Sequence, residues 1–236
     1  MTAASSPTLD SAWVDASVRE IHPDYAAALF VAHHLTPGPT TDASDALLAL
    51  AEARAQSILA GREPHELPEV QAWREAFAGF GVKPREARSS VEALLRRAAA
   101  GLPRIDRLTD AYNAVSVMGL VPIGGEDLTG YRGPARLVIA AGDESFDTIA
   151  DGQPTMQTPI PGEIVWRDDI GVTCRRWNWR QCLRTRLTGA TTDALFIIDG
   201  LGSDSRARAE SAAVELMGIL AAGSPAATFT TRTLAD

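Results

Sequence analysis

The segment from Cys174 to Cys182 holds the densest group of residues that could bind a ligand. It reads Cys-Arg-Arg-Trp-Asn-Trp-Arg-Gln-Cys. Guanidinium groups bind phosphates through paired hydrogen bonds, and indole rings offer faces on which an unpaired base or an aromatic ligand can stack. The amides of Asn178 and Gln181 could recognise a polar edge of that ligand. The pattern equally fits two buried tryptophans surrounded by solvated arginines, so the spacing leaves both interpretations open.

A second group of polar residues lies about sixty positions earlier in the chain. Asn113 and Ser116 are three residues apart and share one flank of a predicted helix. The stretch 122–127 follows and reads Pro-Ile-Gly-Gly-Glu-Asp. Its two glycines permit close approach of the backbone to a ligand, and its two acids could orient a water molecule. A plain turn is the simpler interpretation of this stretch.

The charge of the chain is unevenly distributed. The net charge is −8, but residues 83–107 contain seven basic and three acidic side chains, and residues 175–186 contain five arginines and no acid. The remaining residues therefore carry −17. This balance excludes a protein that coats nucleic acid through bulk positive charge, and it leaves two local segments that could contact an anion.

Several common catalytic signatures are absent from the sequence. It contains no GxSxG nucleophile elbow, no P-loop and no GxGxxG fingerprint. His33 and His34 are adjacent, so on a strand they would point to opposite faces, and Asp168-Asp169 fits a hairpin turn. We therefore expect neither a metal nor a cofactor. With two cysteines, no secretory signal and no apolar run of about 20 residues, we expect a cytoplasmic protein without a membrane segment.

The elements that must position these residues can be read from hydrophobic periodicity. Ser89 and Glu92 form a capping-box pattern, and the apolar stripe that follows predicts a helix that ends before Gly101. Arg88, Arg96 and Arg97 fall off that stripe, so they face solvent or a partner. Further helices are predicted over 42–60, 69–78, 106–117 and 204–222, and strands over 12–18, 25–35, 136–140, 163–166, 172–175 and 194–198.

These elements indicate the class and the extent of the fold. Helices gather early and strands gather late without βαβ alternation, which favours an α+β fold over a doubly wound parallel sheet. The chain has 236 residues, of which 45% are hydrophobic and 22% charged, a composition typical of a globular protein. We expect a loose tail over residues 1–12 and a single domain over 13–236.

Five segments in a fixed order resemble the B3/B4 module of the bacterial phenylalanyl-tRNA synthetase β subunit in a free-standing form. They are residues 80–97, 110–116, 122–127, 161–165 and 174–180, within a resemblance that extends from about residue 73 to residue 200. The resemblance implies an α+β unit with a β-sandwich-type core, flanking helices and a cleft between its lobes. It places that cleft between Asn113 with residues 122–127 and residues 177–181. In the synthetase this module hydrolyses wrongly charged tyrosyl-tRNA.

Two departures from the family pattern concern the site. Where the synthetase commonly has a histidine in a Pro-Met-His-Ala-Phe-Asp stretch, this chain has Gly124. Where the synthetase has Gly-Gly-Glu, this chain has approximately Trp-Arg-Gln at 179–181. The tyrosine-reading chemistry is therefore not carried over, and any deacylation should have another amino-acid specificity.

The residues and the resemblance together predict a tRNA- or RNA-binding protein that could also deacylate a mischarged aminoacyl-tRNA. An ester is already activated, so a positioned water and an oxyanion donor suffice without a covalent nucleophile. A non-catalytic RNA-binding module and a binder of a small amino-acid-like metabolite stay open as alternatives. The predicted site residues are Asn113 and Asp127 for catalysis; Ser116, Gly124, Gly125, Trp177, Asn178, Arg180 and Gln181 for the ligand; and Arg88, Arg96, Arg97, Arg175 and Arg176 for RNA.

Overall fold

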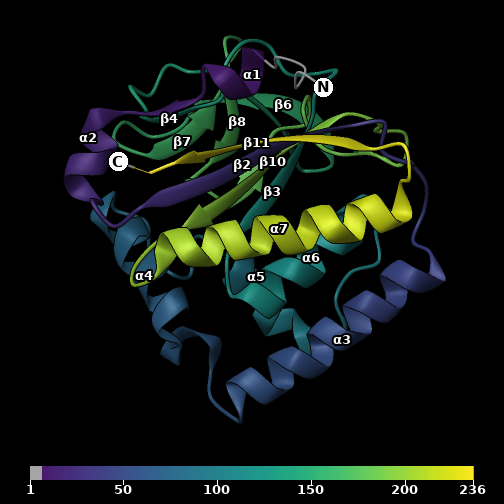
Figure 1. Ribbon diagram of the computed structural model, residues 1–236. Coiled ribbons are helices and arrows are strands. Elements are labelled where there is room, and N and C mark those ends of the chain that lie inside the picture. Colours follow the sequence, from purple (N-terminus) through teal and green to yellow (C-terminus); the bar gives the residue numbers. More distant parts are fainter. Residues whose placement is uncertain (1–6, 236) are drawn as a thin grey trace.

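Two β-sheets face one another at the centre of the molecule (Figure 1). The computed structural model describes residues 7–235. The first sheet has the order β1 (Trp13–Val14), β4 (Arg136–Ile139), β7 (Ile164–Arg167), β8 (Val172–Arg175) and β9 (Arg180–Gln181). The second has the order β11 (Thr228–Leu234), β2 (Ala26–His33), β10 (Ala194–Gly200) and β3 (Ile123–Asp127). A separate hairpin consists of β5 (Phe146–Ala150) and β6 (Gln153–Gln157).

The second sheet is buried on both faces, which explains why β2 and β10 read as continuous apolar runs. Alternate residues point to opposite sides of a strand. Leu29 and Ile197 pack toward the first sheet, where Trp166 meets them, whereas Phe30 and Phe196 pack toward the helices. The rings of Phe30 and Phe196 stack with centroids 4.8 Å apart.

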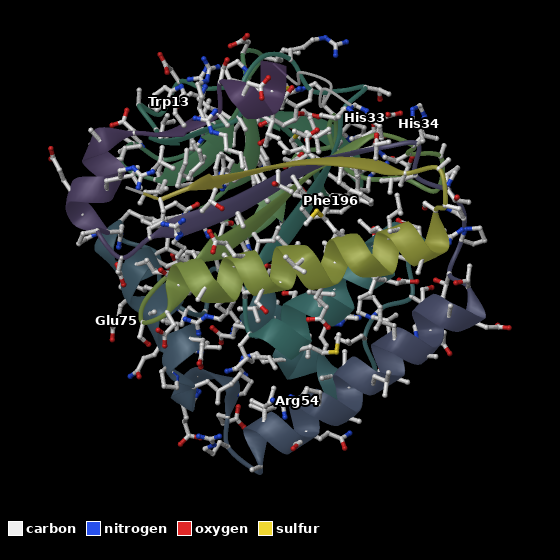
Figure 2. All side chains as sticks on the ribbon, viewed as in Figure 1. Trp13, His33, His34, Arg54, Glu75 and Phe196 are labelled. Carbon is white, nitrogen blue, oxygen red and sulfur yellow. The ribbon has the colours of Figure 1, made fainter. Side chains whose placement is uncertain are left out.

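Helices form a third layer on the outer face of the second sheet. Helices α6 (Arg107–Gly119) and α7 (Ser205–Gly223) cover this face, and α3 (Asp42–Leu59) packs against α6 (Figure 1). Figure 2 labels Phe196, which lies between the sheet and α7. The remaining helical elements are α1 (Pro7–Asp10), α2 (Ala16–Ile21), η1 (Pro64–Glu66), α4 (Pro68–Gly79) and α5 (Ser90–Ala98).

Helix α5 begins with half of the predicted capping box. The Ser89 hydroxyl accepts a hydrogen bond from the Glu92 amide at 3.4 Å, as such a cap requires. The Glu92 carboxylate bonds instead to Arg74, through Nε at 2.9 Å and Nη2 at 2.5 Å. Glu92 is fully buried, and a buried negative charge is stabilised more by positively charged guanidinium groups than by a neutral backbone amide.

The α+β class with a sandwich-type core flanked by helices is confirmed, as are the five predicted helices. Three expectations were wrong. Residues 12–18 form a two-residue strand followed by α2 rather than one strand, and residues 122–127 hold strand β3 rather than a turn. The loose tail expected over residues 1–12 is the third: residues 7–10 form helix α1, in which Leu9 is buried. Residues 1–6 of that tail lie outside the described residues. The single domain over 13–236 stays a prediction.

Within residues 7–235, no helix is both long enough and apolar enough to cross a membrane.

Candidate functional site

A cavity of about 270 Å³ opens between the two sheets beside helices α5 and α6. Its walls come from α5, α6, β3, the end of β10, and the turn between β8 and β9. The polar residues among its walls are Ser90, Arg97, Tyr112, Asn113, Glu126, Asn178, Arg180, Gln181 and Asp199. The cleft implied by the family resemblance is therefore present, at the place expected for it.

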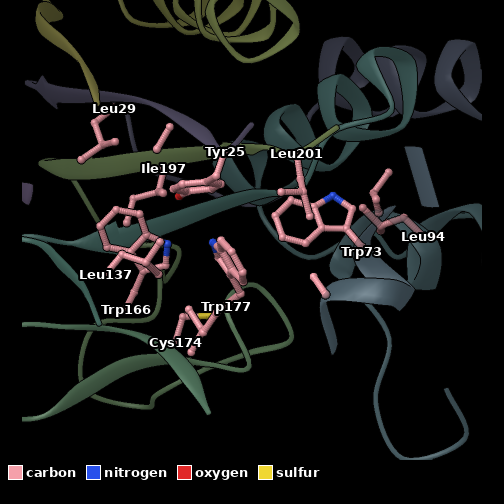
Figure 3. Close-up of a cluster of buried hydrophobic side chains, with 14 of the residues drawn as sticks. Tyr25, Leu29, Trp73, Leu94, Leu137, Trp166, Cys174, Trp177, Ile197 and Leu201 are labelled. Atoms are coloured by element: carbon pink, nitrogen blue, oxygen red, sulfur yellow. The ribbon is translucent and has the colours of Figure 1, made fainter. Parts of the chain in front are cut away.

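The wall formed by the β8–β9 turn is fixed by Trp177. This indole is fully buried and makes edge contacts with Tyr25 and Trp73, at centroid distances of 4.9 Å and 5.3 Å. Figure 3 shows Trp177 in one buried cluster with these two residues and Trp166. Arg176 and Trp177 have φ values of +48° and +65°, which L-residues rarely adopt. The buried anchor holds the turn in this strained conformation.

Three polar side chains along the cavity have unsatisfied atoms. The hydroxyl of Ser90 is buried without a hydrogen-bond partner among the described residues, whereas the amide of Asn178 and Nε1 of Trp177 lie against Asp199 and Tyr25 without good hydrogen-bond geometry. Asn178 is only 8% exposed. A buried polar group without a partner costs about 1–3 kcal/mol. Groups of this kind along one cavity indicate a place where a polar ligand bonds to the protein.

Asp199 is a buried carboxyl group in the cavity wall. Tyr25 Oη and Trp166 Nε1 donate hydrogen bonds to the same oxygen, Oδ1, at 2.6 Å and 3.1 Å. Burial raises the pKa of Asp199 to about 7, while the Tyr25 hydrogen bond opposes that rise. The group therefore exchanges its proton near neutral pH, which suits a general base.

Glu126 is a second buried carboxyl group, on β3. Burial raises its pKa to about 8, and a hydrogen bond from the Thr185 hydroxyl acts in the opposite direction. Gln181 Nε2 donates to the carbonyl of Gly125 at 2.7 Å and so ties β9 to β3, across the two sheets. Glu126 is mainly protonated at pH 7, so it can donate a proton to a ligand oxygen.

The two basic segments of the sequence meet beside the cavity. A neighbouring hollow is lined by Arg88, Arg96 and Arg97 from the α5 region and by Trp179 and Arg180 from the β8–β9 turn. The backbone amide of Ser90 donates to the carbonyl of Asn178 at 3.2 Å, which holds α5 against that turn. Three arginines of the first segment and one of the second therefore line the same hollow.

Many of these arginines have acidic partners. Arg96 and Arg88 lie 3.1 Å and 3.5 Å from the buried Glu92 carboxylate. Arg175 bonds twice to the buried carboxylate of Glu163, at 2.9 Å and 2.7 Å. Within the described part of the chain, Arg97 and Arg180 have no acidic partner, and both are exposed.

Six predicted ligand or catalytic residues line the cavity: Asn113, Gly124, Trp177, Asn178, Arg180 and Gln181. Ser116 does not; it is fully buried in α6, and its hydroxyl donates to the Val121 carbonyl at 2.6 Å. Asp127 does not line the cavity either. Its carboxylate oxygens accept hydrogen bonds from the hydroxyl groups of Thr129 and Thr191, at 2.6 Å and 2.5 Å.

Two further predicted positions are corrected by the structure. At Gly125 an added Cβ would lie 2.6 Å from Leu187 Cδ1, so this glycine allows close packing rather than ligand approach. Arg175 is buried in its ion pair with Glu163, so it is not available to RNA phosphates. Arg176 is half-buried, and its guanidinium carbon lies 4.3 Å from the Trp179 ring centroid.

Sequence reasoning missed Ser90 and Asp199 as cavity residues. Ser90 follows the capping serine and looked like an ordinary first-turn residue. Asp199 follows directly after the predicted apolar strand 194–198, and an acid at the end of a buried strand was the available signal. Glu126 was noticed beside Asp127, but the choice between the two required knowing that β3 is a strand.

Comparisons with known proteins bear on the same region. The family model described as B3/4 domain matches residues 72–215. A search of the curated proteins found no match. Among solved structures, the chain is similar to an N-terminal fragment of the phenylalanyl-tRNA synthetase beta-subunit from Pyrococcus horikoshii, with 12% identity and a TM-score of 0.46. The match covers 99% of this chain and 57% of that fragment.

Proposed function

Since the chain belongs to the B3/4 domain family, we propose that it binds the acceptor end of an aminoacyl-tRNA and hydrolyses the ester of a mischarged one. The observation that carries this proposal is that Arg97 and Arg180, one from each arginine segment, line both the cavity and the hollow beside it. A body that carries −17 outside these segments repels RNA, so binding requires the positive side chains on one face. The aminoacyl group enters the cavity while the RNA backbone stays outside.

The cavity residues supply the chemistry of a water-mediated hydrolysis. Asp199 in its ionised form takes a proton from a water molecule, and the water oxygen attacks the ester carbonyl carbon. Asn178 and Ser90 donate hydrogen bonds to the carbonyl oxygen as negative charge develops on it. The ester carbon–oxygen bond then breaks, and the departing ribose oxygen takes the proton from Asp199. The products are the free amino acid and the uncharged tRNA.

The test is incubation of the protein with a panel of mischarged tRNAs, with release of the amino acid as the measurement. We expect ester loss on a subset of the panel, and loss of that activity in Asp199→Asn with tRNA binding retained. Full activity in Asp199→Asn would remove Asp199 from the mechanism. No ester loss on any tRNA, with tRNA binding intact, would reject hydrolysis and leave the non-catalytic RNA-binding function.

A second candidate function is the binding of a small amino-acid-like metabolite. The polar atoms inside the cavity favour this function. Asn178, Ser90 and Trp177 could be satisfied by such a ligand without any contact to the arginines at the rim. In that case a free amino acid or derivative raises the melting temperature. tRNA then fails to bind at physiological salt, which separates this function from the first.

A further inference from the structure

The cavity and the neighbouring hollow share a boundary, to which helix α5 and the β8–β9 turn each contribute residues. Within the described residues, Ala93 and Arg97 of α5 and Trp179 and Arg180 of the β8–β9 turn line both spaces. Ala93 and Arg97 are four residues apart, so they lie on one face of the helix. A ligand that extends from the cavity into the hollow must pass over these four residues.

The two arginines of this boundary differ from the other arginines around it. Arg88 and Arg96 face Glu92, and Arg176 lies 3.8 Å from Glu163. In the part of the chain that is described, Arg97 and Arg180 form no ion pair, although the exposed Glu86 also lines the hollow. Both side chains are exposed, so their charge is available to an anion from solvent.

Arg180 is also held in place by stacking. Its guanidinium carbon lies 4.5 Å from the centroid of the half-buried Trp179 ring. Stacking on an indole orients the planar guanidinium group, which reduces the entropy lost when it forms two parallel hydrogen bonds. Phosphate matches this fork of donors. The Trp179 ring is correspondingly less accessible to a nucleobase than the sequence suggested.

We propose that Arg97 and Arg180 together bind one phosphate of a nucleoside 5′-monophosphate unit, whose nucleoside end points into the cavity. Asn178, buried in the cavity wall, offers its amide oxygen to a hydroxyl group of that end, while its NH2 group stays available to the ester carbonyl. This inference rests on the proposed function, because it names the nucleotide that brings the ester to the cavity. In a polynucleotide the chain continues from the phosphate across the hollow.

The first experiment measures binding of adenosine 5′-monophosphate, adenosine and inorganic phosphate by calorimetry. We expect the monophosphate to bind at least tenfold more tightly than either of the other two. Tryptophan fluorescence, measured in a Trp13→Phe background, is expected to change on binding, because Trp166, Trp177 and Trp179 line the cavity. Equal affinity for phosphate and monophosphate would overturn the proposal, since it would mean a general anion site.

Variants then test which arginines bind the phosphate. Arg97→Ala and Arg180→Ala should each weaken monophosphate binding at least tenfold, with melting temperatures near that of the wild type because both side chains are exposed. The matched control is Arg54→Ala, which removes an exposed charge on α3 (Figure 2) at a residue that lines neither the cavity nor the hollow. A loss in Arg54→Ala as large as in Arg97→Ala would overturn the proposal in favour of a general charge effect.

Phosphate binding by Arg97 and Arg180 and tRNA binding by the protein can be tested independently of each other. Binding of tRNA that is unaffected by Arg97→Ala and Arg180→Ala would overturn the phosphate assignment and leave tRNA binding standing. Binding of the monophosphate that depends on both arginines, without any tRNA binding, would support the nucleotide site and reject the proposed function.

Discussion

Glu126 and Asp199 hold their protons more strongly in the folded chain than in the unfolded one. Burial raises the pKa of Glu126 from 4.5 to about 8 and that of Asp199 from 3.8 to about 7. Between these limits the folded state binds more protons than the unfolded state, so the free energy of unfolding falls as pH rises. The stabilising contribution is complete below about pH 4 and lost by about pH 8.

The corresponding prediction compares the wild type with Glu126→Gln, which is nearly isosteric and does not titrate. Melting temperatures measured by circular dichroism at pH 5, 6, 7 and 8 should fall with pH in the wild type. The slope should be shallower in the variant. Parallel profiles for the two proteins would contradict the raised pKa of Glu126.

Asp199 gives a prediction about the rate of hydrolysis. As a general base it acts only when ionised, so the rate should rise with pH through an apparent pKa near 7 and level off above about pH 8. The measurement is single-turnover ester loss from a substrate tRNA, corrected for spontaneous hydrolysis at each pH. A corrected rate that does not change between pH 5.5 and 8 would exclude a base of this kind.

The choice between neighbouring side chains could not be made from sequence. Glu126 and Asp127 are adjacent acids, and on strand β3 they point to opposite sides, so one reaches the cavity and the other binds Thr129 and Thr191. The sequence placed Asp127 in the predicted site and treated the stretch as a turn, whereas Glu126 lines the cavity. Ser116 was misplaced for a similar reason, because a helix flank shared with Asn113 does not fix which of the two side chains is covered.

Among the elements, α5 depends on a buried carboxylate at its first turn. Glu92 is fully buried and faces Arg74, Arg88 and Arg96, so loss of its charge leaves Arg74 and Arg88 without an anion and Arg96 with only the more distant Glu63. We expect Glu92→Gln to lower the free energy of unfolding by about 3 kcal/mol, the size found when one partner of a buried pair is removed. Urea unfolding measures this change.

The control for that variant is Glu75→Gln on α4, an exposed glutamate labelled in Figure 2. Its effect should stay within about 0.5 kcal/mol, as for most surface substitutions. Equal effects of the two substitutions would show that the arginine cluster around Glu92 contributes nothing to stability.

Helices and strands whose own residues carry a cap, an apolar run or a regular apolar pattern could be predicted from the sequence. Strands without such a pattern could not. Helices α3, α5 and α6 begin at residues whose side chains cap them, and β2 and β10 are long apolar runs. Strand β6 reads Gln-Pro-Thr-Met-Gln and is largely exposed, so it lacks the alternation that marks a half-buried strand. Strand β3 contains two glycines, and at Gly125 the space of a side chain is taken by Leu187 and Phe196, which lie far away in the sequence.

For the whole molecule, the pairing of arginines limits how strongly RNA binding can depend on salt. Most guanidinium groups near the cavity are held in ion pairs with Glu92 or Glu163, so their hydrogen-bond donors are engaged, which leaves Arg97 and Arg180 as the main phosphate contacts. Each phosphate contact contributes about −0.7 to −0.9 to the slope of log affinity against log salt concentration. Because these two arginines share one phosphate, we expect a slope of about −1 for tRNA, measured by filter binding between 50 and 200 mM salt. A slope near −6 would mean that many more arginines contact the RNA.

The anchored turn that carries Trp177 has a consequence for the energetics and kinetics of binding. Because the indole is locked in the core before any ligand arrives, the cavity wall is preorganised and no loop has to become ordered on association. The entropy that a flexible site loses on binding is instead lost during folding. Association should accordingly proceed in a single kinetic phase whose rate increases linearly with ligand concentration, without the plateau that a slow closing step would impose.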